Sequence, residues 1–288
     1  MDYPTLNLLL PADKVGLQLY QAKISSNLTE KNKYNNVKNF YDKGFNQNYN
    51  LTFQQQFNNI SVYSSFNRYE DKSMIPGAKL LRHNFTTRSV AKFGRGDKWT
   101  ADMKVQYSNT MAQNRPLAGN NNNNVARLLY TFPQSLDITQ FKAGTDQYDN
   151  MIWWNSAGST VNPYWRSKNA LNQDSRDRFI LTGSLKYDIA SWLTAEIKTG
   201  VDMYTNNYVT KIRAGSPIAT NGRYGTGKSV FSEANYSGML TAKKDNLISK
   251  LSANAMVGGN LMLRKGSGID GSANLVVPNL FSLGNAVG

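Results

Sequence analysis

Two segments of this chain, residues 99–107 and 178–204, alternate apolar and polar side chains almost without interruption. In the first segment the two alternating sets are Trp99, Ala101, Met103, Val105 and Tyr107 against Thr100, Asp102, Lys104 and Gln106. Successive side chains of a β-strand point to opposite faces of the sheet, so the pattern predicts strands with one apolar and one wetted surface. A water-soluble sandwich and a transmembrane barrel both satisfy this pattern.

The connections between the predicted strands favour the barrel. Four hairpins are predicted: residues 49–57 returning after Asn58–Asn59, 84–93 with 99–107, 178–188 with 192–204 across 189–191, and 230–242 with 247–263 across 243–246. Between these hairpins lie the much longer connections 70–83, 108–177 and 205–229. Loops this long are uncommon in compact soluble domains. Short turns that alternate with long loops are typical of a transmembrane barrel with short periplasmic turns and long extracellular loops.

Strand length and aromatic placement point the same way. Several predicted strands reach the roughly 9–11 residues that a tilted transmembrane strand needs. Aromatic residues lie towards their ends, as interfacial girdles would require: Phe85, Phe93, Trp99, Tyr107, Phe179, Tyr187, Trp192 and Tyr204. The sequence therefore predicts an all-β fold, a portion of a large antiparallel transmembrane β-barrel, with a soluble sandwich as the alternative.

Composition excludes several classes of protein. The mean hydropathy is −0.52, and the chain has no apolar run near the ~18 residues of a membrane-spanning helix. Cysteine is absent and His83 is the single histidine, so thiolate and histidine-rich metal sites are excluded and no cofactor is expected. The net charge is +14, but lysine and arginine are spread thinly along the chain, and we expect no nucleic-acid partner.

The domain prediction has two parts. Residues 1–47 are expected to form an irregular segment leading into the barrel, and residues 48–288 an incomplete barrel of about eight strands, with the loop 108–177 extracellular. An export signal is not visible after Met1, and the segment 275–283 is loop-like with no strand after it to pair with. We therefore expect the chain to be a piece of a longer protein.

One motif mimics a nucleotide site. Residues 222–229 read Gly-Arg-Tyr-Gly-Thr-Gly-Lys-Ser and match the phosphate-binding loop of P-loop NTPases. That loop requires a buried apolar strand before it and a helix after it. The preceding segment is polar and broken by Pro217, and the following residues alternate as a strand does. The interpretation is a glycine-rich outer loop, with a nucleotide-binding module as an unfavoured alternative.

Several short motifs resemble one family of membrane receptors. The segment 36–45, Asn-Val-Lys-Asn-Phe-Tyr-Asp-Lys-Gly-Phe, with Asn48–Leu51, resembles the start of the barrel in SusC/RagA-type TonB-dependent outer-membrane receptors. Similar motifs are Asn162-Pro163-Tyr164-Trp165, Asp177-Arg178, Trp192-Leu193 and 277–281. The resemblance implies a large plugged barrel in the cell outer membrane, surrounded by its lipid. It also implies a SusD-like surface lipoprotein as partner and glycans or peptides as the imported substrate. Energy for import would come from TonB, which would contact a part of the protein absent from this chain.

The long connection 108–177 is the expected place of ligand contacts. It carries Trp153, Trp154, Tyr164 and Trp165 among many asparagines, and flat rings beside amides suit the apolar faces of sugars. The alternative is that these rings pack the loop onto the barrel. Residues 125–130 are expected to form a short helix in this loop. No catalytic pair is recognised and no enzymatic activity is expected; a β-rich glycan-binding surface adhesin is the alternative function.

Overall fold

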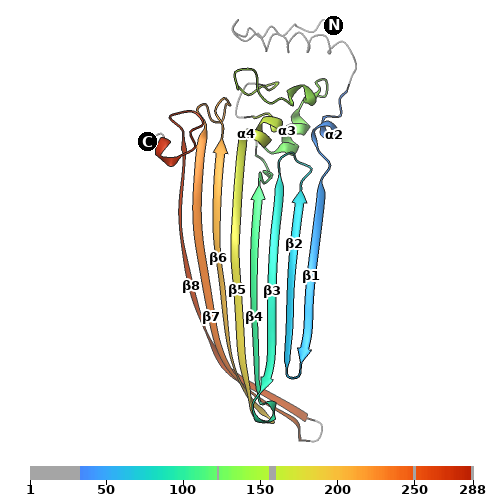
Figure 1. Cartoon of the computed structure of the whole chain (residues 1–288), viewed down its shortest axis with the longest axis vertical. Helices are drawn as coiled ribbons and strands as arrows, with labels where there is room; N and C mark the ends of the chain where they lie inside the picture. Colours follow the sequence, from blue (N-terminus) through green and yellow to red (C-terminus); the bar gives the residue numbers. More distant parts are fainter. Residues whose placement is uncertain (1–32, 122, 156–159, 249–250, 287–288) are drawn as a thin grey trace.

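The computed structural model describes residues 33–121, 123–155, 160–248 and 251–286. Eight strands form one antiparallel sheet in which each strand pairs with its neighbours in the sequence, in the order β1 to β8 (Figure 1). The strands are β1 (Phe45–Phe57), β2 (Ile60–Lys72), β3 (Lys79–Phe93), β4 (Trp99–Gln113), β5 (Ala170–Ala190), β6 (Leu193–Ile212), β7 (Arg223–Ile248) and β8 (Leu251–Asn274). The predicted all-β antiparallel fold is confirmed.

Short helices gather at one end of the sheet, above the strands in Figure 1. They are α2 (Asn36–Phe40), α3 (Val125–Thr131), η2 (Ile138–Phe141) and α4 (Pro163–Asn169), and with residues 34–42 and 114–169 they form what we call the cap. Two more 3₁₀ turns are η1 (Arg95–Asp97), between β3 and β4, and η3 (Leu283–Asn285), after β8. The helix predicted at 125–130 is confirmed as α3. Among the described residues, none of the helices is long and apolar enough to cross a lipid bilayer.

The strands are longer than the alternation alone predicted. The connections at the cap end shorten to 73–78, 114–169 and 213–222, so only the second of the three predicted long loops remains long. The turn predicted at 189–191 lies at 191–192, because β5 continues through Ala190 and β6 begins at Leu193. Residues 33–47, expected to be irregular, contain α2 and the first residues of β1; residues 1–32 lie outside the described residues.

The fourth predicted turn, at 243–246, is wrong. Lys243 and Lys244 are still paired within β7, opposite Asn254 and Ala253, and the register shifts only after Lys244. The polar run resembles a turn by composition, but an antiparallel pair can continue with polar residues on both faces where no apolar surface needs to be covered. The strands separate after Ile248 instead.

Cross-strand register sorts the side chains onto two faces. Directly paired residues share a face, and the row of Val105, Leu181, Val201 and Ala234 is apolar across four strands. The next residues along the same strands form the opposite row, which contains Lys104, Thr182, Gly200 and Asn235. We call these the apolar face and the polar face.

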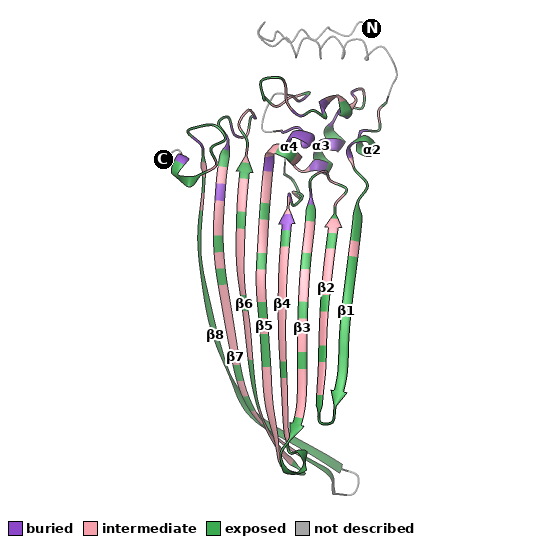
Figure 2. Cartoon of the chain, in the orientation of Figure 1, coloured by how far each residue is buried: buried purple, intermediate pink, exposed green. Residues whose placement is uncertain are grey.

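Most of the buried hydrophobic side chains lie in the cap, and those in the strands, Ala112 and Ala170, lie at the cap ends of β4 and β5 (Figure 2). The main buried cluster contains Phe40, Val125, Leu129, Phe132, Leu136, Ile138, Phe141, Trp153 and Tyr164. On the apolar face of the sheet, by contrast, large side chains such as Ile197 are 62% exposed. Soluble monomers rarely leave an apolar surface of this extent open, so the apolar face requires another apolar phase to cover it.

Candidate functional site

Ion pairs cross the polar face from strand to strand. Arg88 Nε lies 2.9 Å from Asp102 Oδ1, and Arg178 Nε lies 2.8 Å from Asp202 Oδ1, each guanidinium donating a second hydrogen bond to the other carboxylate oxygen. Arg264 donates two hydrogen bonds to Glu233, at 3.1 and 2.9 Å. The first two pairs are bidentate, whereas both donors of Arg264 go to the single oxygen Glu233 Oε2. These contacts orient the charged groups on a surface that remains wetted.

An arginine–aromatic row lies among these ion pairs, and the sequence reasoning missed it. The rings of Tyr204 on β6 and Phe231 on β7 stack with centroids 4.9 Å apart. The Arg176 guanidinium from β5 lies 4.9 Å from the Tyr204 centroid, and that of Arg264 from β8 lies 5.7 Å from the Phe231 centroid. Four successive strands thus contribute one side chain each to a cation–ring–ring–cation stack.

The predicted aromatic girdle is wrong at Tyr204, and Trp192 lies in the turn before β6 beside polar-face residues. Tyr204 pairs with Arg178 and Phe231, so it lies on the polar face and not with the apolar residues. Trp99, Tyr187 and Phe93 do share the apolar face, where Trp99 and Tyr187 stack at 4.3 Å. A signal for the row was present in the sequence: Arg176, Arg178, Asp202, Tyr204, Phe231 and Glu233 fall two apart on adjoining strands.

The four aromatic residues predicted to contact substrate all lie in the cap. Trp153 and Tyr164 belong to the main buried cluster, and Trp165 is 1% exposed in a second cluster with Val161 and Ala170. Trp154 is 37% exposed and its ring meets the edge of Phe132 at 5.9 Å. Three of the four rings therefore pack the cap, and Trp154 is the one whose side chain reaches the surface. Their role in substrate binding stays a prediction.

Two buried asparagines fix the cap around these rings. Asn162 caps α4 by accepting from Tyr164 N at 2.9 Å, and it donates to the carbonyl oxygens of Phe141 and Ile152. Asn36 donates to Leu136 O at 2.9 Å and accepts from Ile138 N at 3.0 Å. The segment before β1 is thereby held against the connection between β4 and β5, although the two are far apart in the sequence.

Burial changes the acidity of groups in the cap. It raises the pKa of the Tyr164 phenol to about 12, and the carboxylates of Asp137 and Asp42 add to the shift. Burial also lowers the pKa of the Arg166 guanidinium. Neither group is placed as an acid–base pair, so these shifts report packing.

The exposed aromatic residues of the cap include two that the sequence reasoning did not select. The side chains of Tyr130 and Tyr148 are 84% and 75% exposed. With Trp154 they are the cap rings that a ligand could stack against without unfolding the cap. No sequence signal separates them from the buried rings, because both sets lie among polar residues.

The P-loop match is not a nucleotide site. Arg223 to Ser229 lie in β7, paired residue by residue with β6 from Ile212 back to Asn206. A Cβ on Gly227 would lie 2.4 Å from the Tyr208 ring, so this glycine allows close ring packing rather than a phosphate cradle. The predicted glycine-rich outer loop is also wrong, since only Gly222 lies outside the strand. Throughout the described residues no group of three or more His, Asp or Glu could hold a metal ion.

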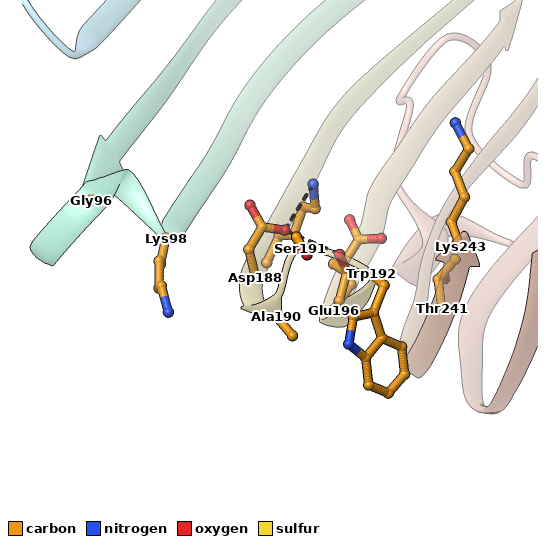
Figure 3. A pocket seen from close by; sticks show the side chains of 11 residues that line it. Gly96, Lys98, Asp188, Ala190, Ser191, Trp192, Glu196, Thr241 and Lys243 are labelled. Atoms are coloured by element: carbon orange, nitrogen blue, oxygen red, sulfur yellow. Dashed lines mark hydrogen bonds and ion pairs between the residues drawn. The ribbon is translucent and has the colours of Figure 1, made fainter. Parts of the chain in front are cut away.

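Two hollows lie on the sheet, one on each face. The first, of about 640 Å³, opens on the polar face at the short-turn end (Figure 3) and is lined by Lys98, Lys186, Asp188, Trp192, Glu196 and Lys243. Within it Lys186 Nζ lies 3.3 Å from Asp188, which also accepts from Thr194. The second, of about 740 Å³, lies on the apolar face where Gly183, Gly238 and Gly259 leave room beside Met103 and Ile197.

Comparisons with known proteins identify the architecture. No protein-family model and no curated protein matches the sequence significantly. The fold is similar to solved structures of the RagAB peptide transporter and of the RagAB peptide importer in its "closed-closed" and "open-open" states. The TM-scores are 0.69, 0.69 and 0.71, at 13%, 13% and 14% sequence identity, over 89%, 90% and 100% of this chain.

The chain spans 28%, 29% and 33% of the length of those three chains. Its eight strands, paired in sequence order with one apolar face, are therefore a portion of a large antiparallel transmembrane β-barrel. In such a barrel the apolar face contacts lipid and the polar face borders the lumen, which places the ion pairs and the arginine–aromatic row on the inner wall.

Proposed function

We propose that this chain forms part of an outer-membrane receptor that imports a nutrient. The observation that carries the proposal is a sheet with one apolar and one charged face. All of this chain matches part of a peptide importer chain in structure. The chain contributes wall and cap to the import path, and catalyses no reaction itself.

Peptides are the favoured substrate class, with glycans as the alternative. The neighbouring structures are those of peptide transporters. The inner wall presents guanidinium groups and aromatic rings together in the arginine–aromatic row, and both can contact the carboxylates and carbonyl oxygens of a peptide. Energy would come from TonB through a part of the protein outside this chain. A SusD-like surface lipoprotein would close over the cap end. The short turns at the other end would then face the periplasm.

Uptake by cells that express the full protein tests the proposal. Labelled oligopeptides and labelled oligosaccharides are offered separately, with and without a working TonB and with and without the lipoprotein partner. The proposal expects TonB-dependent accumulation of peptides. Surface binding without accumulation would instead favour an adhesin, and accumulation of oligosaccharides alone would move the substrate to the glycan class.

A matched pair of variants connects uptake to the inner wall. Arg176→Gln removes a cation from the arginine–aromatic row, whereas Arg68→Gln removes one from the opposite face. Peptide uptake should fall for the first variant and persist for the second. Equal uptake by both would show that the row does not contact the substrate.

A further inference from the structure

Basic residues mark one border of the apolar face. On three strands a lysine or arginine stands two positions beyond the last apolar side chain of this face, counted towards the cap: Arg68 after Phe66, Lys79 after Leu81, and Lys211 after Val209. On β7, Lys228 follows Val230, with Tyr224 further along. On β8, Lys265 follows Leu263 in the same way, with Ile269 further along. We call these five basic residues and Lys72 the basic belt. One acidic residue lies among them on this face: Glu70, between Arg68 and Lys72, forms an ion pair with Arg68 at 2.9 Å.

The opposite border of the apolar face has a different composition. Towards the short turns the face ends in the rings of Phe93, Trp99 and Tyr187, and Lys244 is the one lysine beyond them on this face among the described residues. Of the other lysines at that end, Lys98, Lys186 and Lys243 line the hollow on the polar face, and Lys92 pairs with Thr100 on that same face. Basic residues are therefore concentrated at the cap-side border of the apolar face, with Lys244 alone beyond the opposite border among the described residues.

The basic belt contains a pair of lysines that oppose each other. Lys72 and Lys79 are direct cross-strand partners, so their Cβ atoms lie about 4.5–5.5 Å apart. Like charges directly opposite each other destabilise a sheet. A bound anion between the two ammonium groups would offset their repulsion. Both side chains are exposed, and within the described part of the chain neither forms an ion pair.

The backbone holds this lysine pair in place. Ser73 N donates to Ala78 O at 3.1 Å, Ala78 N donates to Ile75 O, and Ala78 is buried. Gly77 lies against α4 with φ +80, where a Cβ would lie 2.9 Å from Ser167 O. The hairpin therefore keeps the two lysines together. In the same row Phe45 lies beside Lys72, and Gln113 and Gln173 follow Lys79 and carry further N–H donors.

We infer that the basic belt binds the phosphate groups of anionic lipid headgroups at the cap-side border of the membrane, with Lys72 and Lys79 as its strongest site. This inference rests on the proposed function, because it needs the apolar face to lie in lipid. A bilayer places its phosphates just beyond its hydrocarbon core. On β2, β3 and β6 the belt residues stand just beyond the last apolar side chains of the face. Each lysine at such a surface contributes substantially to lipid attraction.

Lipid binding by the full protein in detergent tests the inference, with phosphatidylglycerol as the probe and native mass spectrometry as the readout. Lys72→Gln with Lys79→Gln should weaken the apparent Kd for the first bound lipid by about 30-fold. The charge-preserving change of both residues to arginine should retain the affinity, and Lys104→Gln on the polar face should leave it unchanged. An unaltered affinity in the glutamine variant, or an equal loss in Lys104→Gln, would overturn the inference.

Two further arms separate the possible failures. Inorganic phosphate that displaced the lipid at equal concentration would overturn the assignment to lipid headgroups. Quenching of Trp99 by bromine-labelled acyl chains, taken as the difference from Trp99→Phe, reports whether the apolar face contacts lipid at all. Quenching with no effect of the lysine variants would reject the basic belt alone, whereas absence of quenching would reject the proposed membrane function.

Discussion

The cap and the sheet are stabilised in opposite ways. The cap encloses its own aromatic core and satisfies its buried polar groups with Asn36 and Asn162. The described part of the sheet encloses no core: its stability comes from backbone pairing, wetted ion pairs on one face and an apolar face that needs an external phase. The cap is thus comparable to a small globular domain, and the sheet to a wall that separates two solvents.

The largest expected effect tests the core of the cap. Trp165→Ala empties a site that is 1% exposed and should cost the cap about 3–5 kcal/mol. Hydrogen exchange of the α4 amides in the full protein measures this loss. Tyr130→Ala, at a side chain that is 84% exposed, is the control and should change the stability by less than ~0.5 kcal/mol. Similar effects at both positions would contradict a self-contained cap.

The next effect tests the two faces of the sheet. Ile197→Arg places a charge on the apolar face and should cost about 2–4 kcal/mol of unfolding free energy, because the guanidinium must leave water for hydrocarbon. Thr194→Arg lies on the polar face near Asp188 and should cost much less. Reversible unfolding of the full protein in lipid gives both values, and an equal loss would reject the assignment of the faces.

A smaller effect concerns pH. The folded cap raises the pKa of Tyr164 to about 12, so it stabilises the neutral phenol relative to the unfolded chain, where the pKa is ~10. The stabilisation is complete below pH ~10 and is lost as pH rises through about 12. Absorbance at 295 nm should show one late-ionising tyrosine that Tyr164→Phe removes. A Tyr164→Phe titration identical in this range to the parent's would show that this phenol is not buried.

The smallest effect tests whether the polar face is wetted. Asp202→Asn removes an ion pair whose side chains are 41% and 30% exposed, and should cost less than ~1 kcal/mol. Asp102→Asn, which breaks the pair with Arg88, should behave alike. A loss of several kcal/mol in either variant, measured by the same unfolding experiment, would mean that this face is dry.

The alternation of apolar and polar residues predicted the strands because the two-residue period of a strand can be recognised from neighbouring residues alone. The alternation did not predict the strand ends, because residues 172–177 and Lys243–Lys244 are polar on both faces but still paired. Polarity alone cannot separate a turn from a strand that continues beyond the apolar band. The P-loop match failed for a related reason. Gly227 leaves room for the Tyr208 ring on the neighbouring strand β6, and a short motif cannot show this contact between strands.

The candidate site was harder to predict, because it depends on contacts between distant residues. The arginine–aromatic row needs the registers of β5 to β8, which no short segment specifies. In the cap, Trp154 and Trp165 look alike as sequence, yet the first reaches the surface and the second is buried. Trp165 lies in the first turn of α4, where its N–H donates to Asn162, whereas Trp154 lies in the connection before that helix.

The central claim is that the sheet separates lipid from water, and accessibility along β4 tests it most directly. The chain has no cysteine, so single cysteines at each position from 99 to 107 in the full protein report one site each. In lipid bilayers, a water-soluble maleimide should label positions 100, 102, 104 and 106 and spare 101, 103 and 105, while a lipid-borne quencher should show the inverse pattern. Labelling with no two-residue period, or of 103 more than 102 and 104, would contradict the account.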